Sequence, residues 1–191
     1  YTSRMRETAP AYIVVDYDEY LRIEEASVDV RHELVDGVLY AMVGVTRRHS
    51  LIVGNLFAAL WTPARATGCE LHTNEVKLRV DQSTVYYPDL MIVCDPEDTD
   101  PLVVSRPCLL VEVLSPSTSA TDRREKLAAY RQIPSLLAYL VVHQDEQRVE
   151  RYWRETVDAP WQVASFTAGR VPVPCPETLI ALTDIYAGLP G

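Results

Sequence analysis

Two runs of apolar, strand-forming residues each contain one acidic side chain, and this combination limits how the chain can fold. Asp89 lies in PDLMIVCDP (residues 88–96), and Glu112 lies in LLVEVLSPST (residues 109–118). A carboxylate in an apolar strand loses its hydration, which is costly unless the group is paired, hydrogen-bonded or bound to a cation. Two such acids on neighbouring strands also repel each other unless positive charge lies between them. The two runs therefore predict strands that meet at a cation site.

Mg²⁺ is the cation that best suits such a site, because it favours one or two carboxylates together with water and phosphate oxygens. In phosphodiester hydrolysis a magnesium ion stabilises the attacking and the leaving oxygen. Lys126 belongs to the helix predicted directly after the Glu112 strand. A helix that packs back over a sheet can direct one such residue toward the preceding strand. Its ammonium group would then serve a phosphate or the attacking water.

The remaining sequence predicts helices and strands in one α/β domain. Apolar residues at helical spacing predict helices over residues 17–27, 49–68 and 118–132. Strand patterns cover 31–44 (a pair broken by a turn at Asp36-Gly37), 70–80, 85–93, 107–115, 136–144, 147–155, 161–166 and 171–174. The alternating 147–155 strand is predicted at a sheet edge, where it could contact a second chain. We expect an arm over residues 1–15 and a domain over 16–191, built on a mixed central β-sheet flanked by helices.

Composition and charge exclude several classes of protein. The 191 residues suffice for one sizeable core, and no apolar run reaches the ~20 residues that cross a bilayer. The first residues have no apolar signal-peptide core. The net charge of −9 argues against a protein that mainly coats nucleic acid, because such binding neutralises phosphates with Lys and Arg. It does not exclude a metal-dependent nuclease, whose site is itself built from carboxylates.

The four cysteines show no spacing typical of a metal site. Cys94 and Cys108 lie in apolar strand patterns, where a free cysteine behaves as a small hydrophobic residue. Cys69 and Cys175 stand apart from them in the sequence. We therefore predict four reduced, structural thiols rather than a zinc site or a disulfide framework, and from this a cytoplasmic protein.

The order of these motifs resembles the PD-(D/E)xK nucleases and, within them, the group of putative restriction endonucleases. The matching segments are Glu33-Leu34-Val35-Asp36-Gly37, His49, Pro88-Asp89, Glu112 to Thr118, and Asp122, Lys126 and Tyr130. They belong to a resemblance that covers roughly residues 15–185. The resemblance implies a restriction-endonuclease-like core and a DNA endonuclease that uses Mg²⁺ or Mn²⁺. It further implies a 5′-phosphate product and a homodimer, since cutting both strands needs two sites.

The chain departs from the superfamily pattern in two places. The usual motif lysine stands two residues after the acid, but that position is Leu114 here. The resemblance implies that Lys126 has taken over its role. The family's acid–Tyr–Trp run on the next strand is replaced by Ala138, Tyr139 and Leu140, with His143 beyond them. No role is carried over to that strand.

The expected site combines acids, one carbonyl and one lysine. Asp89 and Glu112 would bind Mg²⁺ together with the main-chain carbonyl of Val113. Glu33 would assist directly or through water. Lys126 would orient or activate the attacking water.

Other residues of the matching segments have interpretations that stay open. His49 and Tyr130 are interpreted as capping or packing residues. Ser115, Ser117 and Thr118 would shape the turn after the Glu112 strand.

Other functions also stay open. A non-catalytic module with the same fold would bind a protein or structured nucleic acid, which the net charge of −9 favours. A nuclease acting on RNA or in repair would use the same site. The arginines are either solvated faces or a path for a phosphate backbone: Arg47-Arg48, Arg123-Arg124, and Arg148, Arg151 and Arg154.

Overall fold

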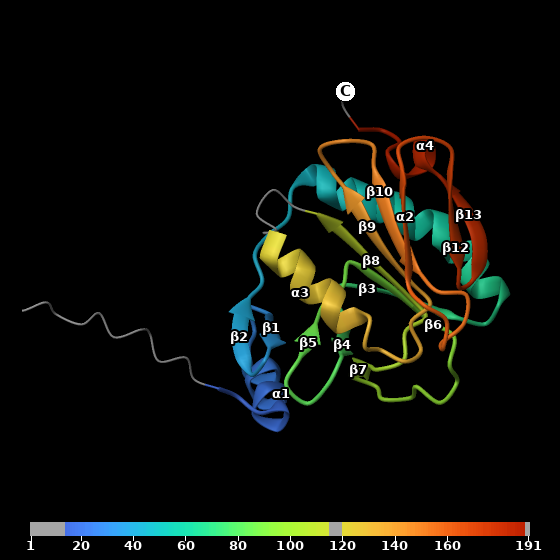
Figure 1. The fold of residues 1–191 in the computed structure, drawn as a ribbon. Coiled ribbons are helices and arrows are strands. Elements are labelled where there is room, and N and C mark those ends of the chain that lie inside the picture. The colour runs from blue at the N-terminus through green and yellow to red at the C-terminus, as the bar shows by residue number, and fades with distance from the viewer. Residues whose placement is uncertain (1–13, 115–119, 190–191) are drawn as a thin grey trace, which may run out of the picture.

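The computed structural model describes residues 14–114 and 120–189, and in this part of the chain three sheets are flanked by four helices (Figure 1). The N-terminal arm up to residue 13, the turn residues Ser115 to Thr118 and the side chain of Asp122 lie outside the described part. Predictions for them are therefore not tested. The division into an arm and one domain likewise stays a prediction.

The largest sheet is mixed and carries the centre of the fold. Its strands, in spatial order, are β11 (Gln162–Phe166), β10 (Val149–Trp153), β9 (Ala138–His143), β8 (Leu109–Leu114), β6 (Leu90–Val93) and β3 (Glu70–Thr73). Only β8 and β9 are parallel among these described pairs. Their connection contains a helix, as a parallel crossover requires. The predicted mixed sheet is thereby confirmed.

Two helices cover opposite faces of this sheet (Figure 1). Helix α2 (Arg47–Ala66) buries Ile52, Leu56 and Leu60 against one face, whose core also contains Leu109 and Leu140. Helix α3 (Ala120–Tyr130) covers the other face. Its core contains the side chains that alternate with the first set, among them Met91, Leu110, Tyr139 and Val141. The central strands are apolar on both faces for this reason.

A second sheet packs beside α3 with the N-terminal helix α1 (Tyr17–Ala26). Its strands, in spatial order, are β2 (Val38–Ala41), β1 (His32–Val35), β5 (Val85–Tyr86), β4 (Lys77–Arg79) and β7 (Val103–Val104). The turn predicted at Asp36-Gly37 joins β1 to β2, and both residues have positive φ, of 50° and 80°. Gly37 suits this conformation because it has no Cβ. This sheet brings Glu33 of β1 to the edge of the main sheet.

The C-terminal part adds a hairpin and a short helix beside α2 (Figure 1). The hairpin consists of β12 (Arg170–Pro174) and β13 (Glu177–Ala181), and α4 (Leu182–Ile185) follows. Val171, Val173 and Ile180 join the core that α2 covers. No helix in the described ranges is both long enough and apolar enough to span a membrane.

Three strand predictions were wrong in detail. The 70–80 segment forms β3 and β4 in different sheets, and the 85–93 segment is likewise divided between β5 and β6. The break in the second segment falls at Pro88-Asp89, where Pro lacks the N–H that a ladder needs. The 147–155 segment is not an edge strand, because β10 pairs with β9 on one side and β11 on the other. Its proposed role as a dimer contact loses its basis.

The prediction for the cysteines was also wrong. Cys69 is bonded to Cys94, and Cys108 to Cys175. These pairs are 25 and 67 residues apart in the sequence, so no local spacing could reveal them. The argument that led from reduced thiols to a cytoplasmic location no longer holds as it stood.

Candidate active site

The acids singled out in the sequence line one cavity of about 470 Å³ between the two larger sheets. The residues of the expected site around it are Glu33, His49, Asp89, Glu112, Val113 and Lys126. They come from β1, the start of α2, the bend before β6, the end of β8, and α3. The tertiary structure therefore gathers residues that are up to 93 positions apart in the chain, as for Glu33 and Lys126.

Asp89 stands in the bend before β6 rather than inside a strand, which corrects the sequence interpretation. The antiparallel register of β6 and β8 pairs Leu90 with Val111, so Asp89 lies beside the end of β8. Its Oδ2 accepts a hydrogen bond from the Val113 N–H at 2.7 Å. The same oxygen lies 3.1 Å from Nε2 of His49. Because both contacts fall on Oδ2, they fix the orientation of the carboxylate.

His49 is a site residue that the sequence interpretation undervalued. It lies in the first turn of α2, where its N–H donates to the Thr46 hydroxyl that caps the helix. Burial lowers the pKa of the imidazole, but the hydrogen bond with Asp89 and the charges of Asp89 and Glu112 outweigh it and raise the pKa. The sequence interpretation gave His49 a capping or packing role, whereas its ring contacts the carboxylate of Asp89. No sequence spacing links positions 49 and 89.

Lys126 reaches the acids from α3. Its Nζ donates to Oε1 of Glu112 at 3.3 Å and to Oε1 of Glu33 at 3.1 Å. All three side chains are mostly buried, with 13–16% of each exposed. Ion pairs that are this well shielded are screened less than surface pairs. The structure thus brings Lys126 to the Glu112 strand, as the helix position predicted, while its chemical role stays a prediction.

Tyr130 both packs in the core and contacts the site. Its ring makes edge contacts with Tyr86 and Tyr139, at centroid distances of 5.4 and 5.1 Å. Its hydroxyl donates to Oε1 of Glu112 at 2.7 Å. Burial and the Glu112 charge raise the pKa of Tyr130 well above its ordinary value, so the hydroxyl keeps its proton. The packing prediction was right but incomplete.

Glu112 shows the electrostatic character of the cavity. Burial raises its pKa from an ordinary value of 4.5 to about 7. Lys126 lowers this pKa, but the charges of Asp89 and Glu33 raise it further, and the Tyr130 hydrogen bond lowers it. One lysine therefore does not balance three neighbouring acids. Glu112 therefore lacks full charge compensation when it is ionised.

The donor set fits a hard divalent cation. Carboxylate oxygens of Asp89 and Glu112 and the carbonyl of Val113 are ligands that Mg²⁺ and Mn²⁺ accept. The acids of this cavity do not form a compact group in which three ligand atoms all lie within 4.8 Å of one another. Among the described residues, the one group of that kind is made by cysteines. A metal here would take one or two carboxylates and keep several waters, as Mg²⁺ usually does.

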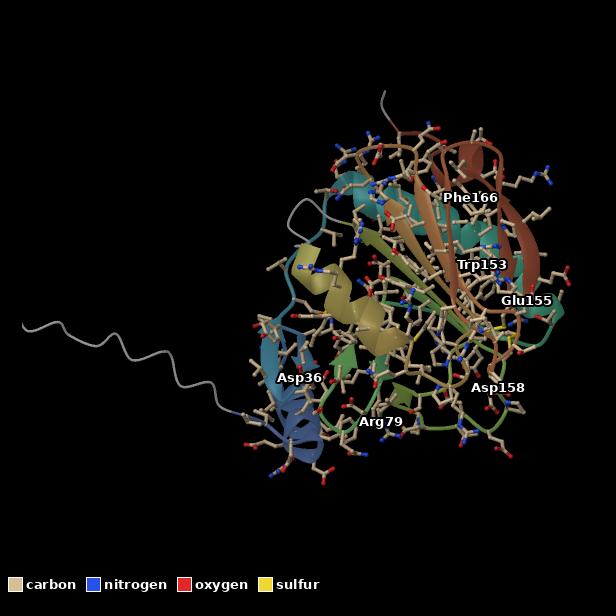
Figure 2. All side chains as sticks on the ribbon, viewed as in Figure 1. Asp36, Arg79, Trp153, Glu155, Asp158 and Phe166 are labelled. Atoms are coloured by element: carbon tan, nitrogen blue, oxygen red, sulfur yellow. A yellow bond between two sulfur atoms is a disulfide. The ribbon has the colours of Figure 1, made fainter. Side chains whose placement is uncertain are left out.

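The arginines are mostly committed to the fold or to other acids. Arg123 donates to Glu150 at 3.3 Å. The guanidinium carbon of Arg151 lies 3.6 Å from the centroid of the Trp153 ring. Arg154 donates to main-chain carbonyls, among them that of Leu136 at 2.7 Å. Figure 2 shows Trp153 on the opposite side of the view from Asp36. Arg151 and Arg154 are therefore structural, which excludes them as an exposed phosphate path.

The mixed sheet, its flanking helices and the acid cavity beside its central strands define a restriction-endonuclease-like fold. A solved structure from Anabaena variabilis, described as "a putative nuclease belonging to DUF820", superposes with a TM-score of 0.72 at 16% identity. The match covers 91% of this chain and 98% of that one. At this identity the match establishes the shared fold alone.

Sequence comparison gives the family. The model of the Uma2 family, described as "Putative restriction endonuclease", matches residues 17–184, and the chain belongs to this family. Two relatives come from Synechocystis: the uncharacterized protein slr1290, 33% identical over 90% of this chain and 91% of its own length, and the uncharacterized protein sll1609, 32% identical over 75% and 82%.

Proposed function

We propose that this protein is a metal-dependent DNA endonuclease whose active site is the cavity formed by Asp89, Glu112, Glu33 and Lys126. The observation that carries the proposal is that Glu33, Asp89 and Glu112 line one cavity together with Lys126, whose Nζ donates to both glutamates. Burial in this cavity raises the pKa of Glu112 to about 7. Such a cavity binds a divalent cation favourably, because the cation supplies the missing positive charge. Membership of the Uma2 family supports nuclease chemistry as the use of that cation.

Asp89, Glu112 and the Val113 carbonyl would hold the metal, Mg²⁺ or Mn²⁺. When bound, the ion supplies Lewis-acid stabilisation of the charge on the attacking and leaving oxygens. His49 and the Val113 N–H keep the Asp89 carboxylate oriented through Oδ2. This orientation exists before the substrate arrives, so it costs nothing during the reaction.

Lys126 and Glu33 act on the water and the phosphate. The Lys126 ammonium donates hydrogen bonds, and a phosphate oxygen or the attacking water replaces one of its two carboxylate partners when substrate binds. Glu33 would hold the attacking water through a hydrogen bond to its carboxylate. Water attack in line with the leaving 3′ oxygen then leaves a 5′ phosphate. Lys126 thus performs the role of the absent motif lysine at Leu114.

We also propose that the enzyme acts on DNA as a homodimer. Cleavage of both strands of a duplex needs two active sites, which a two-fold dimer supplies. Light scattering of the purified chain tests the dimer, and a monomer that still cuts both strands would contradict it.

Cleavage of plasmid, linear duplex and single-stranded DNA in Mg²⁺ or Mn²⁺ tests the activity. We expect Asp89→Ala, Glu112→Ala and Lys126→Ala each to lower the rate at least about a hundredfold. Glu155→Ala, which removes an exposed acid far from the cavity, serves as the control and should cleave like the wild type. Full activity in all three cavity variants would refute the site.

One observation favours a second candidate, a non-catalytic binding module. Lys126 already pairs with Glu33 and Glu112, so the cavity is partly neutralised without a metal. A folded wild-type protein that neither binds Mn²⁺ by calorimetry nor cleaves any of the three substrates would support this alternative. Binding of Mn²⁺ that Glu112→Ala abolishes would favour the enzyme.

A further inference from the structure

All four cysteines of the chain meet at one end of the six-stranded sheet. Cys69 precedes β3, Cys94 follows β6 and Cys108 precedes β8, and these strands are neighbours. Their antiparallel register places the end of β6 beside the starts of β3 and β8. Cys175 reaches the same point from the turn between β12 and β13. We call these four residues the cysteine cluster.

The two disulfides of the cluster are in direct contact with each other. Sγ of Cys94 lies 3.5 Å from Sγ of Cys108 and 3.4 Å from Sγ of Cys175. Two independent disulfides could stabilise the fold equally well at separate places. A tetrahedral zinc site with Zn–S bonds of about 2.3 Å separates its sulfurs by about 3.8 Å. The Sγ atoms of Cys94, Cys108 and Cys175 all lie within 4.8 Å of one another, which is close to that separation. Cys69 lies outside this group of three and is linked to it through its bond to Cys94, so it would have to move to become the fourth ligand.

The surroundings suit thiolate ligands. Cys69 and Cys108 are each only 7% exposed, whereas Cys94 reaches the surface and offers an entry path. The Thr67 hydroxyl donates to Sγ of Cys69 at 3.2 Å, a hydrogen bond of the kind that supports a metal ligand from outside. Among the described residues that line the acid cavity there is no cysteine. The cluster is a separate place in the molecule.

We propose that the cysteine cluster is a redox-linked metal site, which binds one Zn²⁺ through four thiolates when its disulfides are reduced. A dithiol reductant transfers two electrons and two protons to each disulfide, which yields four thiols, while two dithiols become disulfides. Zn²⁺ then binds to the four sulfurs as their protons pass to solvent. Soft thiolates select zinc over the hard cations that carboxylates prefer.

The metal would tie the C-terminal hairpin to the central sheet in a reducing compartment, as the disulfides do in an oxidising one. Cys108 and Cys175 join β8 to the hairpin, and Cys69 and Cys94 join β3 to β6. A site with four cysteines leaves no open position, so its role is structural rather than catalytic.

The test uses the full chain, reduced with a phosphine and freed of metal under nitrogen, and Co²⁺ as the probe. Tetrahedral Co²⁺ bound to thiolates absorbs strongly in the visible range, unlike Co²⁺ bound to carboxylates and water. We expect this absorption to saturate at one Co²⁺ per chain and to disappear when Zn²⁺ is added. A reduced chain that keeps its circular dichroism but shows no such absorption would overturn the proposal.

Substitutions distinguish the cluster from the acid cavity. Cys94→Ser and Cys175→Ser should each weaken Co²⁺ binding at least about tenfold, since the loss of a ligand exceeds the loss of an outer hydrogen bond. Glu112→Ala is the matched control and should leave the thiolate absorption and its stoichiometry unchanged. An affinity for Co²⁺ that Cys94→Ser leaves unchanged, or a thiolate absorption that Glu112→Ala removes, would contradict the assignment.

A second measurement applies even if the reduced, metal-free chain unfolds. Native mass spectrometry of protein purified under nitrogen from a reducing bacterial cytoplasm should show one Zn²⁺ per chain. Four free thiols should be titratable after the same sample is denatured. Two intact disulfides without metal in that sample would overturn the proposal.

Discussion

The two ends of strands β6 and β8 carry opposite chemistry. At one end, Asp89 precedes β6 and Glu112 lies near the end of β8. At the other end, Cys94 follows β6 and Cys108 precedes β8. The antiparallel pairing of β6 and β8 brings Asp89 close to Glu112 at one end and Cys94 close to Cys108 at the other. One short ladder thereby positions a set of hard oxygen ligands and a set of soft sulfur ligands.

The two ends differ in whether their functional groups are satisfied by partners within the protein. Burial raises the pKa of Glu112 to about 7, so the acid end keeps unbalanced charge that a cation can satisfy. The sulfurs of the other end satisfy one another in two disulfides. The acid end is therefore suited to a ligand that binds and leaves during a reaction, and the sulfur end to a structural cross-link.

The largest expected effect separates the two ends by activity. Glu112→Gln keeps the volume of the side chain but removes the charge that binds the metal, and should lower the cleavage rate about 10²–10³-fold. Glu97→Gln makes the same change at an exposed acid near Cys94, and should alter the rate less than about twofold. The rate on linear duplex DNA at saturating Mg²⁺ is the measurement. An equal loss of cleavage rate in both variants would show that the activity does not depend specifically on the acid end.

The next effect separates the ends by stability. Reduction of the two disulfides in metal-free protein should lower the free energy of unfolding by about 2–4 kcal/mol for each disulfide, because the unfolded chain regains freedom. Urea denaturation with and without the reductant measures this loss. Added Zn²⁺ should restore part of it. Glu112→Gln protein should show the same loss, and an unchanged midpoint after complete reduction would contradict the structural role of the cluster.

The pH dependence of stability should be governed by the acid end. The pKa of Glu112 is raised from 4.5 to about 7, so between these values the folded chain keeps a proton that the unfolded chain has lost. The contribution of this group to the stability of metal-free protein therefore falls as the pH rises from about 4.5 to about 7. Denaturation series across this range should show the decline in the wild type. The decline should be weaker in Glu112→Gln, and identical curves would show that Glu112 is not responsible.

The smallest effect concerns one hydroxyl group. Tyr130→Phe keeps the ring between Tyr86 and Tyr139 but removes the donor to Glu112, at a cost of about 1 kcal/mol. Because this hydrogen bond lowers the pKa of Glu112, its loss should shift the pH-dependent decline upward. Tyr152→Phe, which removes a hydroxyl that donates to Glu150, is the matched control. A shift of the same size in the control would exclude a specific link to Glu112.

Much of the fold was predictable because its signals are local. The apolar spacing of α2, the turn at Asp36-Gly37 and the buried pattern of β9 each follow from a few consecutive residues. The division of residues 70–80 and 85–93 between two sheets was not predictable. A strand pattern says which side chains are buried, but not which neighbouring strand buries them.

The site shows the same division. Asp89 and Glu112 were recognisable because each places a charge in an apolar run, where burial is costly. Lys126 was recognisable from its place on the helix after the Glu112 strand and from the family resemblance. Glu33, His49 and Tyr130 received their contacts from other parts of the chain, at separations of 93, 40 and 18 residues. The cysteines were misjudged because sulfur is accepted among apolar residues whether it is free, bonded or metal-bound.

The sequence by itself therefore determined an α/β fold and singled out two acids that violate a local apolar pattern, with one lysine on the helix that follows. Only the tertiary structure decided that Lys126 stands between Glu33 and Glu112, and that four cysteines from separate strands meet. The physical reason is that a charged residue within an apolar run can be recognised from its immediate sequence neighbours. The pairing of distant groups depends on strand register and sheet order, which no short stretch of sequence contains.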